Sequence, residues 1–226
     1  MTLHCAFIGF GKSTTRYHLP YVLHRKDRWQ VAHIYRRRAK PEEQAPQYSH
    51  IHFTSDLDEV LNDPLVKLVV VCTHADSHFE YAKKALEAGK NVLVEKPFTP
   101  TPEEAKTLFA LANSKGLTVT PYQNRRFDSC FLTTKKVIES GKLGELVEIE
   151  SHFDNYRPLA ETNPGGPQNG EFYGLGVHTL DQIISLFGRP DHVSYDLRSL
   201  RNKANPDDTF EAQLFYGDLK AIVKTS

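Results

Sequence analysis

The first half of the chain alternates strictly between strand-like and helix-like segments, and this order restricts the possible folds most. Within the predicted strand Val66–Thr73, residues Leu68–Cys72 are wholly apolar, as expected when both faces of a strand are covered. Neighbouring parallel strands need crossover connections, which the intervening helices supply. We therefore expect an α/β fold with a Rossmann-type doubly wound parallel sheet. Its other predicted strands are Leu3–Gly9, Val31–Tyr35, Ile51–Thr54, Asn91–Glu95 and Leu117–Pro121.

The helices between these strands have recognisable ends. Thr101-Pro102-Glu103-Glu104 places Thr at the N-cap, Pro at N1 and Glu at N3, which predicts a helix that ends near Gly116. Ser55-Asp56-Leu57-Asp58 resembles a capping box and opens a helix that stops before Pro64. Further helices are expected from Ser13 to about Arg25, disturbed at Pro20, and over His74–Ala88.

The pattern changes after about residue 124, which predicts a dinucleotide-binding domain at 1–123 and a second domain at 124–226. The second part predicts an α+β domain with a largely antiparallel, open sheet, and residues 157–173 are expected to form a long loop. The chain stops inside the last predicted strand, so we expect this sheet to be incomplete at its C-terminal end. Its predicted helices are Ser129–Ser140 and Gly176–Phe187, and its strands Leu146–His152, His192–Leu200, Asp208–Tyr216 and Leu219–Thr225.

Composition argues against several classes of protein. The 28 basic and 28 acidic residues balance, which gives no reason to expect nucleic-acid or membrane binding. No segment reads as a signal peptide or approaches the roughly 20 apolar residues of a membrane helix. The three cysteines, Cys5, Cys72 and Cys130, are an odd number without a C-x-x-C pair, so we expect neither disulfides nor a metal site. These features predict a cytoplasmic location.

Residues 5–14, CAFIGFGKST, contain two overlapping phosphate-binding patterns. A P-loop ending at Gly11-Lys12-Ser13 would have to begin at Ala6, inside an apolar strand, which leaves too short a loop to wrap a phosphate. In the Rossmann interpretation, Gly9 makes the tight turn and Gly11 lets the backbone approach a pyrophosphate at a helix N-terminus. The third glycine position holds Thr14. We favour the Rossmann interpretation and expect Lys12, Ser13 and Thr14 to contribute to phosphate binding.

The end of the second predicted strand indicates which dinucleotide is bound. Proteins that bind NAD usually carry an acid there for the ribose 2′-hydroxyl, but this chain continues Tyr35-Arg36-Arg37-Arg38. Arginines pair with a 2′-phosphate bidentately, whereas a carboxylate would repel it. Arg36 and Arg37 therefore predict NADP rather than NAD, the alternative being a solvated basic turn.

Three segments resemble the glucose-fructose oxidoreductase/inositol dehydrogenase family (Gfo/Idh/MocA), and the resemblance covers nearly the whole chain. The family has a strand ending in Thr, then a His, and then A-L-x-A-G-K-x-V-x-x-E-K-P, and it also has a later G-x-H-x-x-D. Matching residues are Thr73, His78, Ala85–Lys90, Glu95-Lys96-Pro97, Gly176, His178 and Asp181, and Gln123–Phe127 resembles the segment after the last Rossmann strand.

The resemblance implies a catalytic role for Lys96, beside Pro97 at the carboxyl end of a buried strand. A desolvated lysine near other cations exchanges protons near neutral pH. The family places a histidine such as His178 beside the substrate, and Asp181, three residues on, would hold its tautomer or form the site wall. The expected cofactor-binding residues are Gly9, Gly11, Lys12, Ser13, Thr14, Arg36, Arg37, Thr73, His74, His78, Glu95, Lys96, Pro97 and Asn124.

One position departs from the family pattern. Its sugar and inositol dehydrogenases carry an Asp four residues before the histidine, where this chain has Gly174. The Lys–Asp–His trio is therefore incomplete, and Asp154, Tyr156 or Tyr173 are the possible substitutes.

These features predict an NADP(H)-dependent oxidoreductase that acts on CH–OH groups of a small sugar, polyol or carbonyl substrate. The alternative is a sensor or regulatory protein of the same fold that binds the dinucleotide without turnover. By analogy with the family, we also expect a homodimer that forms through the second domain's sheet.

Overall fold

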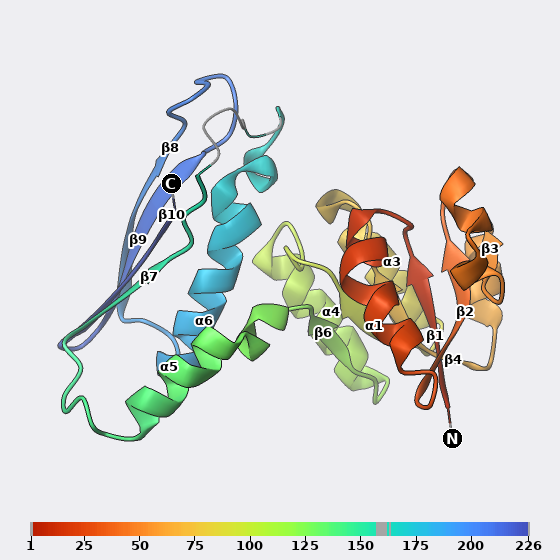
Figure 1. Cartoon of the computed structure of the whole chain (residues 1–226), viewed down its shortest axis with the longest axis horizontal. Helices are drawn as coiled ribbons and strands as arrows, with labels where there is room; N and C mark the ends of the chain where they lie inside the picture. Colours follow the sequence, from red (N-terminus) through yellow and green to blue (C-terminus); the bar gives the residue numbers. More distant parts are fainter. Residues whose placement is uncertain (1, 157–161, 163, 226) are drawn as a thin grey trace. The chain divides into compact units, whose positions relative to one another are not determined.

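The computed structural model describes residues 2–156, 162 and 164–225 and divides the chain into two compact units, residues 1–122 and 123–226 (Figure 1). The boundary lies one residue before the predicted one. No helix among these described residues has both the length and the apolar character needed to cross a membrane.

The first unit is built on a six-stranded sheet in which every pairing is parallel, in the order β3-β2-β1-β4-β5-β6. This order confirms the predicted Rossmann fold, in which ligands bind beside the strands where the order reverses. Here that switch point lies between β1 and β4. The strands are β1 (Leu3–Ile8), β2 (Trp29–Tyr35), β3 (His52–Thr54), β4 (Val66–Val71), β5 (Asn91–Val94) and β6 (Val119–Pro121).

Alternating side chains of the central strands supply two separate cores. Ala6 and Ile8 of β1 pack in one apolar cluster, and Cys5 and Phe7 pack in the other. Burial on both faces accounts for the nearly continuous apolar character of these strands. The helices of the unit are α1 (Leu19–His24), α2 (Leu57–Asn62), α3 (His78–Glu87) and α4 (Pro102–Ser114).

The first helical segment differs from the single disturbed helix expected over residues 13–25. A π-helical turn at Thr14–His18 precedes α1, and the Leu19 amide donates to the Thr14 carbonyl. The irregularity therefore begins before Pro20, which lacks an amide hydrogen and cannot continue the ordinary hydrogen-bond pattern. The wider turn buries both Thr14 and His18.

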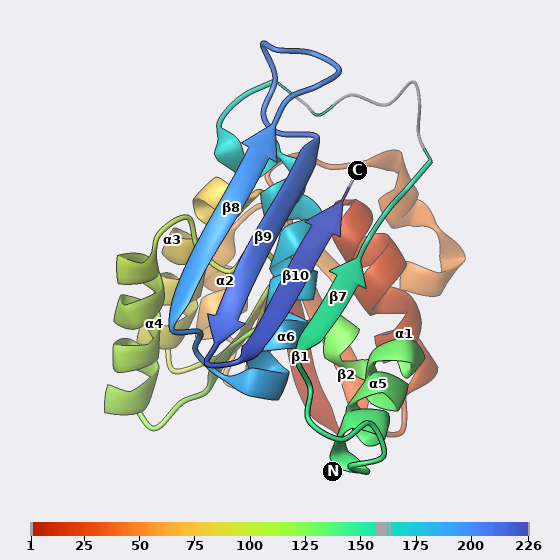
Figure 2. The same ribbon diagram turned by 90° about the vertical axis from the view of Figure 1, so that its left-hand side faces the viewer.

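The second unit contains helices α5 (Ser129–Glu139) and α6 (Val177–Phe187) and a four-stranded sheet in the order β7-β10-β9-β8 (Figure 2). The sheet is antiparallel except where β10 pairs with β7, as the largely antiparallel prediction requires. Ile183 of α6 packs with Phe210, Leu214 and Val223 in its core, whereas every residue of β8 is exposed. The strands are β7 (Glu148–His152), β8 (His192–Arg198), β9 (Thr209–Tyr216) and β10 (Leu219–Thr225).

The loop predicted over residues 157–173 falls partly outside the described residues. Its described part contains a 3₁₀ turn at Pro167–Asn169 and the start of a π-helical turn, Phe172–Gly176, that leads directly into α6. The helical segment expected to start at Gly176 therefore starts earlier.

Candidate functional site

The turn after β1 requires glycine at its first position. Gly9 has φ +109°, and a Cβ built there would lie 2.6 Å from the Cys72 carbonyl oxygen, closer than real Cβ contacts allow. Its amide also donates to the Tyr35 carbonyl at 2.8 Å, which ties the turn to the end of β2. Gly11 differs, because a Cβ there would meet nothing within 4 Å. The space beside Gly11 is open to a ligand.

The helical segment begins directly after Gly11, so there is no loop long enough to wrap a phosphate as a P-loop does. The Thr14 hydroxyl donates to the Gly9 carbonyl at 2.8 Å, and the residue is fully buried. Thr14 therefore fixes the turn from inside instead of facing a ligand. This contact explains why the third glycine position accepts threonine.

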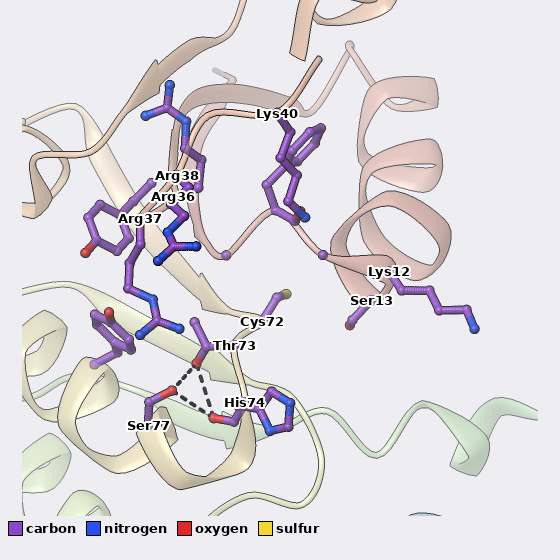
Figure 3. A pocket seen from close by; sticks show the side chains of 15 residues that line it. Lys12, Ser13, Arg36, Arg37, Arg38, Lys40, Cys72, Thr73, His74 and Ser77 are labelled. Atoms are coloured by element: carbon purple, nitrogen blue, oxygen red, sulfur yellow. Dashed lines mark hydrogen bonds between the residues drawn. The ribbon is translucent and has the colours of Figure 1, made fainter. Parts of the chain in front are cut away.

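A pocket of about 830 Å³ opens at the carboxyl ends of β1, β2 and β4 (Figure 3). Among the described residues, none that lines this pocket is Asp or Glu, so its wall favours an anionic ligand. Eight residues predicted to bind cofactor line it: Gly9, Gly11, Lys12, Ser13, Arg36, Arg37, Thr73 and His74. Seven others also line it and were not predicted: Phe10, Tyr35, Arg38, Lys40, Cys72, Ser77 and Tyr81.

Arg36 lines the pocket, but its charge is already paired. Its Nε and Nη2 donate to the two carboxylate oxygens of Glu43 at 2.8 and 3.0 Å. Burial would raise the pKa of Glu43, but the hydrogen bonds from Arg36 and the Lys40 amide outweigh it and lower the pKa. The sequence predicted that Arg36 would bind a 2′-phosphate, but in the structure its guanidinium is paired with Glu43.

Four exposed cations line the pocket: Lys12, Arg37, Arg38 and Lys40. In Figure 3, Arg37 extends toward Thr73 and Ser77, whereas Arg38 points the opposite way and Lys12 points away from the arginines. Lys40 donates to the Phe10 carbonyl at 2.6 Å, which joins the basic segment to the glycine turn. Arg37 is therefore the cation best placed inside the pocket.

Glu95 is buried and accepts hydrogen bonds from three residues near the glycine turn. Its carboxylate accepts hydrogen bonds from the Ser13 hydroxyl, from His18 Nε2 at 2.8 Å and from the Lys96 amide at 3.0 Å. Burial would raise the pKa of Glu95, but the bonds from His18 and Ser13 outweigh it and hold the pKa below its ordinary value. Glu95 therefore connects the start of the first helical segment to the half-buried Lys96, which precedes a cis peptide bond to Pro97.

His78 fixes the other side of the Lys96 turn. It is fully enclosed, and its ring nitrogens face the carbonyl oxygens of Pro97 at 2.8 Å and Thr73 at 3.1 Å. His78, Glu95 and Pro97 therefore shape the backbone around the site, while Thr73 and His74 line the pocket itself.

His18, Cys72 and Glu95 bring their ligand-type atoms within 4.8 Å of one another. His18 and Glu95 are already bonded to each other, and burial, with the Glu95 charge next in size, raises the pKa of Cys72 to about 12. The thiol is therefore protonated at neutral pH in this arrangement. His18 and Glu95 form a buried hydrogen-bonded pair beside it.

The second unit holds the remaining predicted residues. His178 is buried on α6, and the Asp181 carboxylate accepts two hydrogen bonds from Arg126, at 2.6 and 2.7 Å. Arg126 lies in the 3₁₀ turn Asn124–Phe127, which begins at the predicted residue Asn124. The partner of Asp181 is an arginine that was not predicted to take part.

Gly174 stands where the family pattern has an aspartate, within the π-helical turn. A Cβ at Gly174 would lie 3.5 Å from the carboxylate of Glu171. Of the substitutes predicted from the sequence, Tyr156 is 95% exposed. The Asp154 Oδ2 atom lies 3.4 Å from Nδ1 of His152. Glu171, which directly precedes the π-helical turn, was not among the substitutes named from the sequence.

The Glu95 network gives a test of stability against pH. Because the pKa of Glu95 is lower in the folded chain, its contribution is complete above its unfolded pKa of about 4.3 and is lost as the pH falls through the folded value. Glu95→Gln should lower the free energy of unfolding by about 1–3 kcal/mol at pH 7. Urea unfolding at pH 7 and pH 4 should show this difference shrinking at the lower pH; a constant difference would contradict it.

Comparisons with known proteins agree with this architecture. Residues 3–123 match a family model described as an oxidoreductase family with an NAD-binding Rossmann fold, and residues 135–226 match that family's C-terminal alpha/beta domain. The chain is 87% identical over its full length to YhhX, an uncharacterized oxidoreductase of Escherichia coli, and covers 66% of that protein.

Two proteins of lower sequence identity are also similar to the chain. Over 98% of the chain, it is 35% identical to the scyllo-inositol 2-dehydrogenase (NADP(+)) IolW of Bacillus subtilis, of which it covers 62%. The crystal structure of an oxidoreductase from Bacillus cereus superposes with a TM-score of 0.93 at 50% identity, covering 99% of this chain and 64% of the other. The chain thus spans less than two thirds of the length of these relatives.

Proposed function

Since the chain belongs to the Gfo/Idh/MocA oxidoreductase family, we propose that it binds NADP(H) and transfers a hydride between the nicotinamide and a small sugar, polyol or carbonyl substrate. The observation that carries this proposal is the pocket at the switch point of the Rossmann sheet. Cations line it, the glycine turn closes one side, and no described Asp or Glu faces it. Such a wall suits a dinucleotide with an additional phosphate.

The preference for NADP rests on Arg37, Arg38 and Lys40. These cations lie in the segment directly after β2, where an acid would serve an NAD ribose. Glu43 is near, but Arg36 and the Lys40 amide already use its oxygens. The relative from Bacillus subtilis is named as an NADP(+) enzyme, which is consistent with the same preference here.

In the proposed reaction, Lys96 exchanges the proton and the bound nicotinamide supplies the hydride acceptor. As a substrate alcohol is oxidised, its C–H hydride leaves and Lys96 Nζ takes the hydroxyl proton, so that a carbonyl forms. In reduction, Lys96 returns that proton to the oxygen. His178, in the second unit, takes the substrate-binding role that the family resemblance implies for this histidine. Glu95 and His78 fix the backbone on both sides of Lys96.

A dinucleotide sensor without turnover is the second candidate, and Gly174 in place of the family's aspartate favours it. Fluorescence titration with NADPH and NADH tests cofactor binding in both candidates. A panel of sugars, polyols and carbonyl compounds, followed at the nicotinamide absorbance, then separates them. Turnover supports the oxidoreductase, and tight binding without turnover supports the sensor. Homodimerisation through the second sheet remains part of the proposal, and a monomer mass by light scattering would contradict it.

Arg37→Ala should raise the Kd for NADPH by about 10- to 100-fold, because it removes a charge-assisted contact to the 2′-phosphate. The Kd for NADH should change less than about twofold, since NADH lacks that phosphate. Arg16→Ala, an exposed arginine that does not line the pocket, is the matched control. Equal loss of affinity for both dinucleotides would contradict the proposed role of Arg37.

A further inference from the structure

The segment from Arg36 to Glu43 is held in shape by one buried carboxylate. Glu43 lies in a 3₁₀ turn, Pro41–Gln44, and is only 8% exposed although it belongs to a surface segment. Its oxygens accept from Arg36 Nε and Nη2 and from the Lys40 amide at 2.8 Å. One side chain therefore fixes both ends of the segment that carries Arg37 and Arg38.

The same segment is also joined to the glycine turn. Lys40 Nζ donates to the Phe10 carbonyl at 2.6 Å, and its ammonium lies 5.9 Å from the centre of the Phe10 ring. Phe10 is buried and lies between Gly9 and Gly11. Lys40 therefore links Glu43, which binds its amide, to the pocket wall at Phe10, which binds its ammonium. A phosphate would lie beside this wall.

The hydrogen bonds of Glu43 exclude one alternative role. An acid near the end of the second strand of a Rossmann sheet often accepts from the ribose 2′-hydroxyl of NAD. Glu43 cannot do so in this arrangement, because its side chain is buried against Arg36 and each oxygen already accepts at least one hydrogen bond. Its contribution to cofactor choice must be indirect.

We propose that Glu43 is a positioning residue for cofactor specificity: it neutralises Arg36 and fixes the segment from which Arg37 reaches the place of the 2′-phosphate. This inference rests on the proposed function, because it assumes that the pocket takes NADP. Preorganised cations bind a phosphate more tightly than mobile ones, since less side-chain and loop freedom is lost on binding. The NADPH affinity should therefore depend on a residue that does not touch the cofactor.

Two effects of removing Glu43 oppose each other. Loss of a negative charge near the pocket would strengthen NADPH binding, whereas release of the segment would weaken it. Glu42 provides the comparison, because it is the adjacent acid in the same 3₁₀ turn but is exposed. Charges in water are strongly screened beyond about 10 Å, so the general charge effect should be small. Glu42→Ala measures that effect alone.

The test compares Glu43→Ala, Glu43→Gln and Glu42→Ala in the full chain by titration with NADPH and NADH. Glu43→Ala should raise the Kd for NADPH about tenfold, the equivalent of one charge-assisted hydrogen bond, and leave the NADH Kd within about twofold. Glu42→Ala should leave both within about twofold. Glu43→Gln keeps an oxygen for the Lys40 amide, so its NADPH Kd should rise about threefold. This variant also serves if Glu43→Ala does not fold.

The outcomes separate this inference from the proposed function. Equal affinities of the unmodified chain for NADPH and NADH would overturn the NADP assignment and the inference with it. A preference for NADPH that Glu43→Ala and Glu43→Gln both retain would overturn the inference alone. Tighter NADPH binding in Glu43→Ala would also overturn it, because the released Arg36 would then be the better phosphate ligand.

Discussion

Replacing Lys96 with alanine should lower kcat by about 100- to 10,000-fold, the range that a general acid–base group contributes. The proton on the substrate oxygen would lose its acceptor in oxidation and its donor in reduction. The Kd for NADPH should change less than about threefold, because Lys96 does not line the pocket beside the glycine turn. Steady-state kinetics on a substrate that the unmodified chain turns over, with NADPH titration, measures both quantities.

Lys84→Ala is the matched control for this experiment. Lys84 is an exposed lysine on α3, so its loss removes the same charge from the same unit. Its kcat should equal that of the unmodified chain. If Lys96→Ala also retained its kcat, the lysine would be removed from the mechanism.

Gly9→Ala should lower the free energy of unfolding by about 2–4 kcal/mol, which combines backbone strain at positive φ with a steric clash. The new Cβ would lie 2.6 Å from the backbone oxygen of Cys72, which directly follows the central strand β4 and whose amide donates to the Ile8 carbonyl, so it cannot move as a flexible side chain can. The turn would shift relative to β4, and NADPH binding should weaken at least about tenfold. Urea unfolding and NADPH titration check the two effects.

Two other glycines separate the causes. Gly89 has φ +77° but a Cβ there would meet nothing within 4 Å, so Gly89→Ala measures the backbone strain without a clash. Gly11 has neither a positive φ nor a close neighbour. Gly11→Ala should therefore leave stability unchanged while weakening NADPH binding, if the cofactor occupies the open space beside it. Equal destabilisation by Gly9→Ala and Gly89→Ala would contradict the role of the Cys72 carbonyl.

The sheet of the first unit could be predicted because the sequence patterns that specify its strands and helices each span only a few residues. The apolar run Leu68–Cys72 and the helix signal at Thr101-Pro102 each report a physical requirement within a few residues. The second sheet was predicted as largely antiparallel, but the parallel pairing of β10 with β7 was not, because it joins segments that are far apart in sequence.

The parts of the site that were not predicted depend on long-range or irregular contacts. The sequence could not pair Glu43 with Arg36, since the two are seven positions apart and Glu43 lies in a 3₁₀ turn. The burial of Thr14 and His18 follows from a π-helical turn that no residue pattern marks clearly. Arg38, quoted in the basic run, and Lys40 were not predicted as cofactor-binding residues, because the strand-end pattern concerns the first residues after the strand, whereas the pocket extends along the following segment.

The order of strands in the second sheet has a consequence for synthesis on the ribosome. Among the strands that the structure describes, β7 pairs with β10 alone, and Glu148 is aligned with Lys220, 72 positions later. At about 5–20 residues per second, β7 therefore emerges several seconds before its partner exists. During that interval its backbone amides and carbonyls are available to any other strand edge. The growing chain therefore passes through a period in which the second unit is open to mispairing, and the length of that period is set by the elongation rate.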